Sequence, residues 1–227
     1  MDALLRRGRV LARPTSRWDD PAAVRLRQTG APVSSIFALS PIVPWDDDET
    51  TVQRAARLDA RMWAPGIGLF RDGVLRVRDR EPVERPDLAG SFDMVGFSYY
   101  SALGVADGKV VVHPHGAARS PLGYGIWPDG VGLVLDRLHA ELPGTPLLVA
   151  ELGIGTDDDA ERAAYVERAL AVIHAAIDRG VDVRGVFHWT SVDNYEWTFG
   201  FGVRFGIIDR DRQLKPSAQI LAAEALR

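Results

Sequence analysis

Pro146-Leu-Leu-Val-Ala-Glu151 decides the fold of this chain, because it is apolar at almost every position until its last residue. Such a continuous apolar run predicts a strand buried on both faces, as parallel sheets contain. A helix is expected next, begun by the acids Asp157–Asp159 and ended by Gly180. A further apolar run, Val183-Arg-Gly-Val-Phe-His-Trp189, predicts another strand. The order strand, helix, strand indicates parallel β/α packing.

The same alternation extends toward the N-terminus. Residues 33–40 and 92–100 have the composition of strands, and apolar residues at helical spacing predict helices over 46–62 and from Trp127 onward. Residues 1–20 are predicted to be a loose arm, which leaves 21–227 as the folded domain. The remaining segments are expected to be a short helix ending near Gln28, a long loop with a hairpin over 65–90, a long loop over 104–125, a short extra strand over 205–209 and a terminal helix opened by Pro216.

A doubly wound open sheet is the rival architecture for such an α/β pattern. That fold binds dinucleotides through a Gly-rich turn after a strand, and no turn of that type follows any predicted strand here. The polar and aromatic residues at three strand ends, described next, favour the β/α barrel. In that fold, functional side chains gather at the carboxyl ends of the strands.

Composition excludes several classes of function. The 227 residues are 46% hydrophobic, which suffices for one sizeable core, and the net charge of −4 predicts no nucleic-acid partner. No cysteine is present, and the five histidines lack metal-ligand spacing, so no metal or other cofactor is expected. No apolar run has membrane-spanning length and no secretory signal is visible, so a cytoplasmic protein that binds no membrane is expected.

Three predicted strands end in polar and aromatic residues. Strand 92–100 ends in Ser98-Tyr-Tyr100, strand 146–151 ends in Glu151, and strand 183–189 continues into Trp189-Thr-Ser-Val-Asp-Asn-Tyr-Glu-Trp197. Indole faces beside carboxylates suit a sugar, because the ring packs on carbon while the carboxylates accept hydrogen bonds from hydroxyls. A buried aromatic corner with a capping acid is the alternative for the last segment.

Glu151 is the strongest single candidate for a catalytic residue. A carboxylate held against an apolar strand is costly unless it is paired or positioned for reaction. A tyrosine hydroxyl from the preceding strand would keep it ionised and oriented as a nucleophile. A purely structural ion pair is the other interpretation.

With these residues in place, the chain resembles the C-terminal half of a family 1 glycoside hydrolase, the β-glucosidase family of retaining enzymes. The resemblance runs from about Ala31 to Ala222, and its anchors are residues 33–44, 92–101, 121–153 and 187–209. It implies a partial (β/α)8 TIM barrel of about four βα units within 21–227. It also implies hydrolysis of a β-linked glycoside or oligosaccharide through a glycosyl-enzyme intermediate.

The resemblance also implies roles for individual residues. Glu151 falls on the family's nucleophile and Tyr100 on the tyrosine that orients it. The sugar-binding positions are Ser98, Trp189, Glu196, Trp197 and Phe205. Two positions depart from the family pattern: Leu152 replaces the asparagine after the nucleophile, and Ser98 replaces an asparagine in the same pocket.

The family's general acid/base is the glutamate of an Asn-Glu pair on the fourth barrel strand. Asn194 is the only asparagine here and Tyr195 follows it, so this chain lacks that pair. Its first matching strand corresponds to the fifth of the family. A four-strand sheet cannot close a barrel, so a homodimer or a complementing N-terminal half chain is expected. The second hypothesis is a degenerate, non-catalytic half barrel that binds sugar or serves as an assembly partner.

Overall fold

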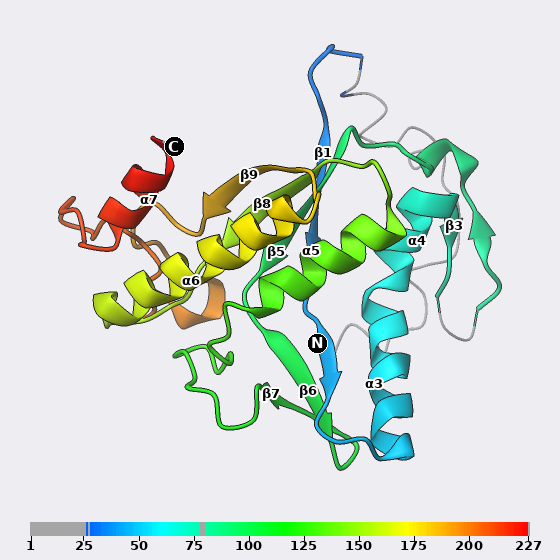
Figure 1. The fold of residues 1–227 in the computed structure, drawn as a ribbon, viewed down its shortest axis with the longest axis horizontal. Coiled ribbons are helices and arrows are strands. Elements are labelled where there is room, and N and C mark those ends of the chain that lie inside the picture. Colours follow the sequence, from blue (N-terminus) through cyan, green and yellow to red (C-terminus); the bar gives the residue numbers. More distant parts are fainter. Residues whose placement is uncertain (1–25, 27, 78–79, 227) are drawn as a thin grey trace.

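The computed structural model describes residues 26, 28–77 and 80–226, and its centre is a four-stranded parallel sheet (Figure 1). All four strands confirm the sequence prediction. They are β1 (Ser34–Ala38), β5 (Met94–Tyr99), β8 (Leu147–Leu152) and β9 (Val183–His188). The predicted arm 1–20 and most of the short helix predicted before Gln28 lie outside the described residues.

The strand order is β1-β5-β8-β9, so every strand pairs with its neighbours in sequence. All three pairings are parallel. A doubly wound sheet instead reverses its strand order at a switch point. Within the described part of the chain, this sheet has no such reversal.

Helices connect the strands and cover one face of the sheet. Figure 1 shows α5 (Gly130–Glu141) and α6 (Asp159–Asp178) lying across that face. The acids predicted to begin α6 do so, because the Asp158 carboxylate accepts from the backbone N–H of Ala160. Gly180 follows the helix at φ +97°, a conformation that residues with a Cβ rarely adopt. The other helices are α3 (Glu49–Met62), α4 (Ala64–Asp72) and α7 (Ala218–Glu224).

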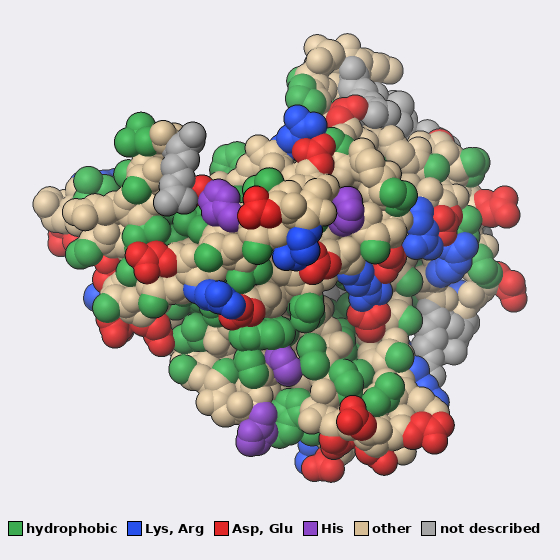
Figure 2. Space-filling view, in the orientation of Figure 1, with side chains coloured by type: hydrophobic (Ala, Val, Ile, Leu, Met, Phe, Trp, Pro, Cys, Tyr) green, Lys and Arg blue, Asp and Glu red, His purple; other side chains and the backbone are tan. Residues whose placement is uncertain are grey.

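The core lies between the sheet and these helices. Val95 and Phe97 of β5, Val149 of β8 and Leu135 of α5 are all fully buried there. Figure 2 shows the outer side of the helix layer, where acidic and basic side chains alternate with apolar ones. Such mixing is typical of a solvated surface.

The opposite face of the sheet is more exposed. Strand side chains alternate between faces, and Ile36 of β1 and Phe187 of β9 are 63% and 58% exposed. Their neighbours Phe37 and Val186 pack on the core. The sheet therefore presents large apolar side chains on the side away from its helices.

Three sequence predictions need correction: two loops that contain regular elements, and a short strand over 205–209 that does not form. Segment 65–90 contains the helix α4, although its predicted hairpin is present as β3 (Val74–Leu75) and β4 (Val83–Glu84). Segment 104–125 contains most of β6 (Ala102–Ala106) and all of β7 (Lys109–His113), which form a second sheet with β2 (Ile42–Pro44). Residues 205–209 form only isolated bridges through Ile208. Two short 3-10 turns, Pro86–Leu88 and Trp197–Phe199, complete the elements.

Candidate active site

The candidate site lies where β5, β8 and β9 end. Parallel strands bring their carboxyl ends to one edge, and Glu151 stands opposite Ser98 in the ladder. The register shifts just before this pair, so that Ala150 is an extra residue in β8. Such a bulge re-aims the following side chains. It lets Val149 and Leu152 both reach the core, while Glu151 lies between them on the other side.

Tyr100 holds the Glu151 carboxylate. Its hydroxyl donates a hydrogen bond of 2.6 Å to Glu151 Oε2. Burial raises the pKa of Tyr100 well above its usual value, and the hydrogen bond and charge of Glu151 raise this pKa further. The hydroxyl therefore keeps its proton and remains a donor throughout the physiological range. A donor fixed on one carboxylate oxygen orients Glu151.

A second carboxylate lies nearby. The indole N–H of Trp189 donates to Glu196 Oε1 at 3.0 Å, and Glu196 is only 7% exposed. The charge of Glu196 also contributes to the raised pKa of Tyr100. The structure thus gathers two acids, a phenol and an indole, all predicted from sequence, at one sheet edge.

Phe205 forms an aromatic wall of the same region. It is 3% exposed, and its ring meets the Tyr100 ring edge-on with the centroids 5.9 Å apart. A narrow crevice adjoins this pair, lined in part by Tyr124, Ile126, Gly153 and Gly155.

The two crevice glycines were missed by the sequence prediction. A Cβ on Gly153 would lie 2.2 Å from the Trp189 carbonyl oxygen, and one on Gly155 would lie 3.0 Å from the Phe205 ring. The absence of a side chain thus lets the segments carrying Trp189 and Phe205 approach β8. The sequence Gly153-Ile-Gly155, which follows Glu151 and Leu152, was the available signal, since glycine marks close backbone approach.

Ser98 and Trp197, which were both predicted to bind sugar, differ in their exposure to solvent. Ser98 is 9% exposed and lies beside Glu151 in the sheet. Trp197 is 85% exposed, so its indole face is open to solvent and not packed into the cluster. The role predicted for Trp197 in binding sugar stays a prediction.

No group of three or more His, Cys, Asp or Glu side chains is arranged to hold a metal ion among residues 26, 28–77 and 80–226. Over the same ranges, no helix is both long and apolar enough to cross a membrane.

Comparison with known families agrees with this arrangement. The model of glycosyl hydrolase family 1 matches residues 73–222, which include the ends of β5, β8 and β9. The chain belongs to glycosyl hydrolase family 1. The match contains Tyr100, Glu151, Trp189, Glu196 and Phe205.

Curated members of the family are longer than this chain. A β-galactosidase from Saccharolobus solfataricus is 33% identical over 206 residues, which are 81% of this chain and 40% of that protein. Thermostable β-glucosidase B from Thermobispora bispora is 33% identical over 148 residues, 58% of this chain and 30% of that protein. The chain thus spans less than half the length of these relatives.

Solved family structures show the same relation. A β-glycosidase from Pyrococcus horikoshii superposes with a TM-score of 0.79 at 27% identity, over 88% of this chain and 49% of that one. A β-glucosidase from Thermotoga maritima in complex with glucoimidazole gives 0.77 at 23% identity, over 88% and 52%. This α/β fold with parallel strands therefore corresponds to about half of each structure.

Proposed function

We propose that this chain carries the nucleophile and sugar-binding half of a retaining β-glycosidase. The hydrogen bond from Tyr100 to Glu151 carries the proposal, because it places an oriented carboxylate at the carboxyl edge of the sheet. Ser98, Trp189, Glu196, Trp197 and Phe205 would surround the sugar. The substrate class is a β-linked glycoside or oligosaccharide.

The proposed reaction begins with attack by Glu151 on the anomeric carbon. A bond forms between that carbon and a carboxylate oxygen, and the glycosidic C–O bond breaks with its electron pair leaving on the aglycone oxygen. Water then cleaves the glycosyl ester, releasing the sugar and restoring the carboxylate. Glu196, fixed by the Trp189 indole, would accept hydrogen bonds from hydroxyls of the bound sugar.

The departing oxygen needs a proton unless it is a very stable anion. In the family this proton comes from the glutamate of an Asn-Glu pair, and this chain has no such pair. We infer that the acid/base is supplied from outside these 227 residues. Loss of general acid catalysis typically costs 10²–10⁴-fold in rate.

We further propose that the sheet is the C-terminal half of a (β/α)8 barrel and binds a polypeptide equivalent to the missing half. The coverage of about half of each solved relative supports this. So does an apolar groove of about 460 Å³ beside β9, lined in part by Ile173, Ile177, Val183, Phe187 and Leu221. Strand β9 is one edge of the sheet and β1 is the other. A second copy of this chain is the competing occupant of these edges.

A mechanism-based label tests the role of Glu151. A 2,4-dinitrophenyl 2-deoxy-2-fluoro-β-glucoside has a leaving group that needs no proton, and its fluorine slows hydrolysis of the glycosyl-enzyme. The purified chain is incubated with this compound, and also with the galactose analogue. Intact mass and peptide mapping then show whether a sugar is attached. We expect one fluorosugar on Glu151 and none in the Glu151→Gln variant.

The rival hypothesis is a degenerate half barrel that binds sugar or a partner without turnover. The missing Asn-Glu pair favours it, because the family's proton donor to the departing oxygen is not in this chain. A folded chain that binds the glycoside in calorimetry yet forms no adduct would support this rival. An adduct on any acid other than Glu151 would overturn the assignment of the nucleophile.

A further inference from the structure

The short segment Arg204-Phe205-Gly206 is held by side chains in addition to backbone hydrogen bonds from Thr156 and Thr190. It belongs to no strand, yet each of its three carbonyl oxygens accepts a hydrogen bond from a side chain. Arg162 Nη2 donates to the Arg204 oxygen at 2.8 Å, and His188 Nε2 donates to the Phe205 oxygen at 3.2 Å. Lys215 Nζ donates to the Gly206 oxygen at 2.7 Å. We call these three side chains the clamp.

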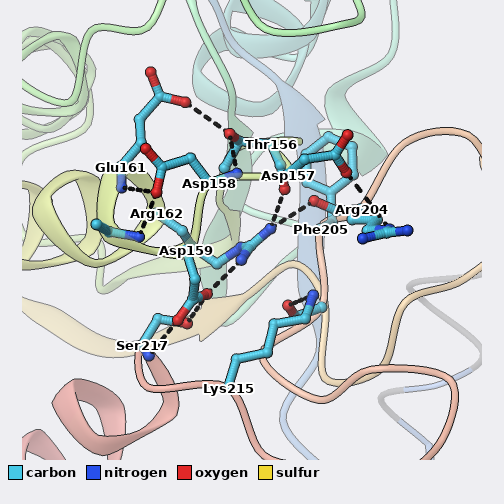
Figure 3. Close-up of polar contacts among 12 residues, drawn as sticks. Thr156, Asp157, Asp158, Asp159, Glu161, Arg162, Arg204, Phe205, Lys215 and Ser217 are labelled. Atoms are coloured by element: carbon cyan, nitrogen blue, oxygen red, sulfur yellow. Dashed lines mark hydrogen bonds and ion pairs between the residues drawn. The ribbon is translucent and has the colours of Figure 1, made fainter.

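The clamp residues come from different parts of the fold. Arg162 lies on α6, His188 ends β9, and Lys215 lies in the segment before α7. Figure 3 shows the Arg162 guanidinium reaching the backbones of Thr156 and Arg204, with Lys215 nearby. The clamp therefore fixes one short segment against two layers of the molecule.

Two of the clamp residues are cations held in ion pairs. The Arg162 side chain is 1% exposed and pairs with Asp159, while the Lys215 side chain is 15% exposed and pairs with the buried Asp193 at 2.8 Å. Burial of such pairs is costly, and apolar replacements are often equally stable. Simple packing does not require them. What they add is a fixed backbone position, since Arg162 donates to the carbonyl oxygens of Thr156 and Arg204 and Lys215 donates to that of Gly206.

The segment they fix carries Phe205. The Phe205 ring is buried between the Gly155 backbone and the Tyr100 ring. Tyr100 in turn donates to Glu151 at 2.6 Å. A displaced Arg204–Gly206 backbone would move the Phe205 ring, release the Tyr100 ring and change the hydrogen bond to Glu151.

We propose that Arg162, His188 and Lys215 are positioning residues that, by holding the backbone around Phe205, set the orientation of Tyr100 toward the nucleophile. The clamp acts on Glu151 only through Phe205 and Tyr100. This inference rests on the proposed function of Glu151 for its catalytic consequence, but its geometric part can be measured separately.

The geometric part is tested with ¹³C-labelled tyrosine. The ζ-carbon resonance of Tyr100 reports the state of its hydroxyl, and Tyr100→Phe assigns it. Tyr99, which donates to the Trp127 oxygen at 2.5 Å, is the internal reference. The variant R162K keeps the charge but loses the planar fork of donors. The control is R168M, which removes a 59% exposed arginine from the same helix.

We expect R162K to shift the Tyr100 resonance and to leave that of Tyr99 in place, whereas R168M shifts neither. The rate constant of labelling by the fluoroglucoside, kinact, is expected to fall about 10- to 100-fold in R162K, with its binding constant KI nearly unchanged. If R162K fails to fold, H188L and H188Q replace it. H188Q retains an amide donor and is expected to restore much of the kinact lost in H188L.

The outcomes separate the two proposals. A folded R162K or H188L with the wild-type Tyr100 resonance and wild-type kinact would overturn the positioning role. A wild-type chain that is never labelled would overturn the proposed function, while the resonance comparison would still decide whether the clamp orients Tyr100. Equal losses in R162K and R168M would indicate general destabilisation and would also overturn the clamp.

Discussion

At the scale of single residues, the site depends on one short hydrogen bond. Tyr100 keeps its proton because burial and the adjacent Glu151 both raise its pKa, so the bond from Tyr100 to Glu151 persists across the working pH range. A hydrogen bond to a charged group is worth about 1.5–3 kcal/mol. Glu151 without this donor would be free to rotate away from the substrate.

Replacement of Tyr100 by phenylalanine tests whether its hydroxyl orients Glu151. We expect Y100F to lower kinact for the fluoroglucoside about tenfold, which corresponds to roughly 1.4 kcal/mol, with little change in KI. The matched control is Y195F, since Tyr195 is 62% exposed. Labelling rates measured by intact mass over a range of glycoside concentrations give both constants. A Y100F chain that reacts as fast as the wild type would remove Tyr100 from the mechanism.

Trp189 is expected to affect binding of the glycoside, not the rate at which Glu151 reacts with it. Its indole N–H is the donor that fixes the buried Glu196 carboxylate. Trp189→Phe keeps a ring face but leaves a carboxylate oxygen without this donor, so KI is expected to rise about tenfold while kinact changes little. The control W45F removes another partly exposed indole N–H elsewhere in the fold. A selective loss of kinact in W189F would contradict the assignment.

Sequence singled out Tyr100, Glu151 and Glu196, but not the residues that hold them in place. Tyr100, Glu151 and Glu196 were found because polar residues follow apolar strands and match a family pattern. The β-bulge at Ala150 could not be predicted from the sequence, because alanine is compatible with both a regular and a bulged strand. The partners of Lys215 and Arg162 were invisible for another reason: carbonyl oxygens 9 and 42 residues away carry no side-chain signal.

At the scale of elements, α6 is tied to the C-terminal segment through Asp159. Its carboxylate accepts from the Ser217 backbone N–H at 2.8 Å and from the Ser217 hydroxyl at 2.7 Å, and it pairs with Arg162. Burial alone would raise the pKa of Asp159, but these donors outweigh it and hold the pKa below its usual value. The ionised form is therefore stabilised by folding.

The depressed pKa of Asp159 makes the stability of the protein depend on pH. A carboxyl whose folded pKa is depressed stabilises the protein above its unfolded pKa, about 3.9, and this contribution is lost as the pH falls through the folded pKa. Asp159→Asn is expected to lower the urea midpoint at pH 7, and the gap to wild type should narrow toward pH 2.5. The control D136N removes a half-exposed acid from α5. A gap that stays constant with pH would show that Asp159 does not titrate as inferred.

Helices and strands were predicted correctly where apolar residues recur at regular spacing. The prediction failed where glycine and proline are frequent. The four core strands and α3, α5 and α6 were found from apolar spacing. Helix α4 was missed because Pro65, Gly66 and Gly68 read as loop residues. Proline is tolerated in a first helical turn, and the α4 glycines lie close to other segments of the chain, as Gly66 does to the Phe37 ring. Sequence alone could not show that contact.

At the scale of the whole molecule, the chain covers about half of the solved family structures that it matches. Both edge strands carry an exposed apolar side chain, Ile36 on β1 and Phe187 on β9. The half-barrel interpretation predicts that these edges meet a polypeptide equivalent to the first four βα units. Edges of this kind are prone to pair with other chains. A second copy would also cover them, but it would bring no Asn-Glu pair.

Complementation distinguishes these partners. The N-terminal part of the Saccharolobus solfataricus β-galactosidase, ending where the match to this chain begins, is co-expressed with the chain. We expect a one-to-one complex and hydrolysis of an alkyl β-galactoside, whose leaving group requires a proton. Hydrolysis should disappear in E151Q, which leaves the interface unchanged. A chain that remains a homodimer and excludes the N-terminal part would show that its edges evolved for self-association, and the missing acid would then mark a protein that binds sugar without cleaving it.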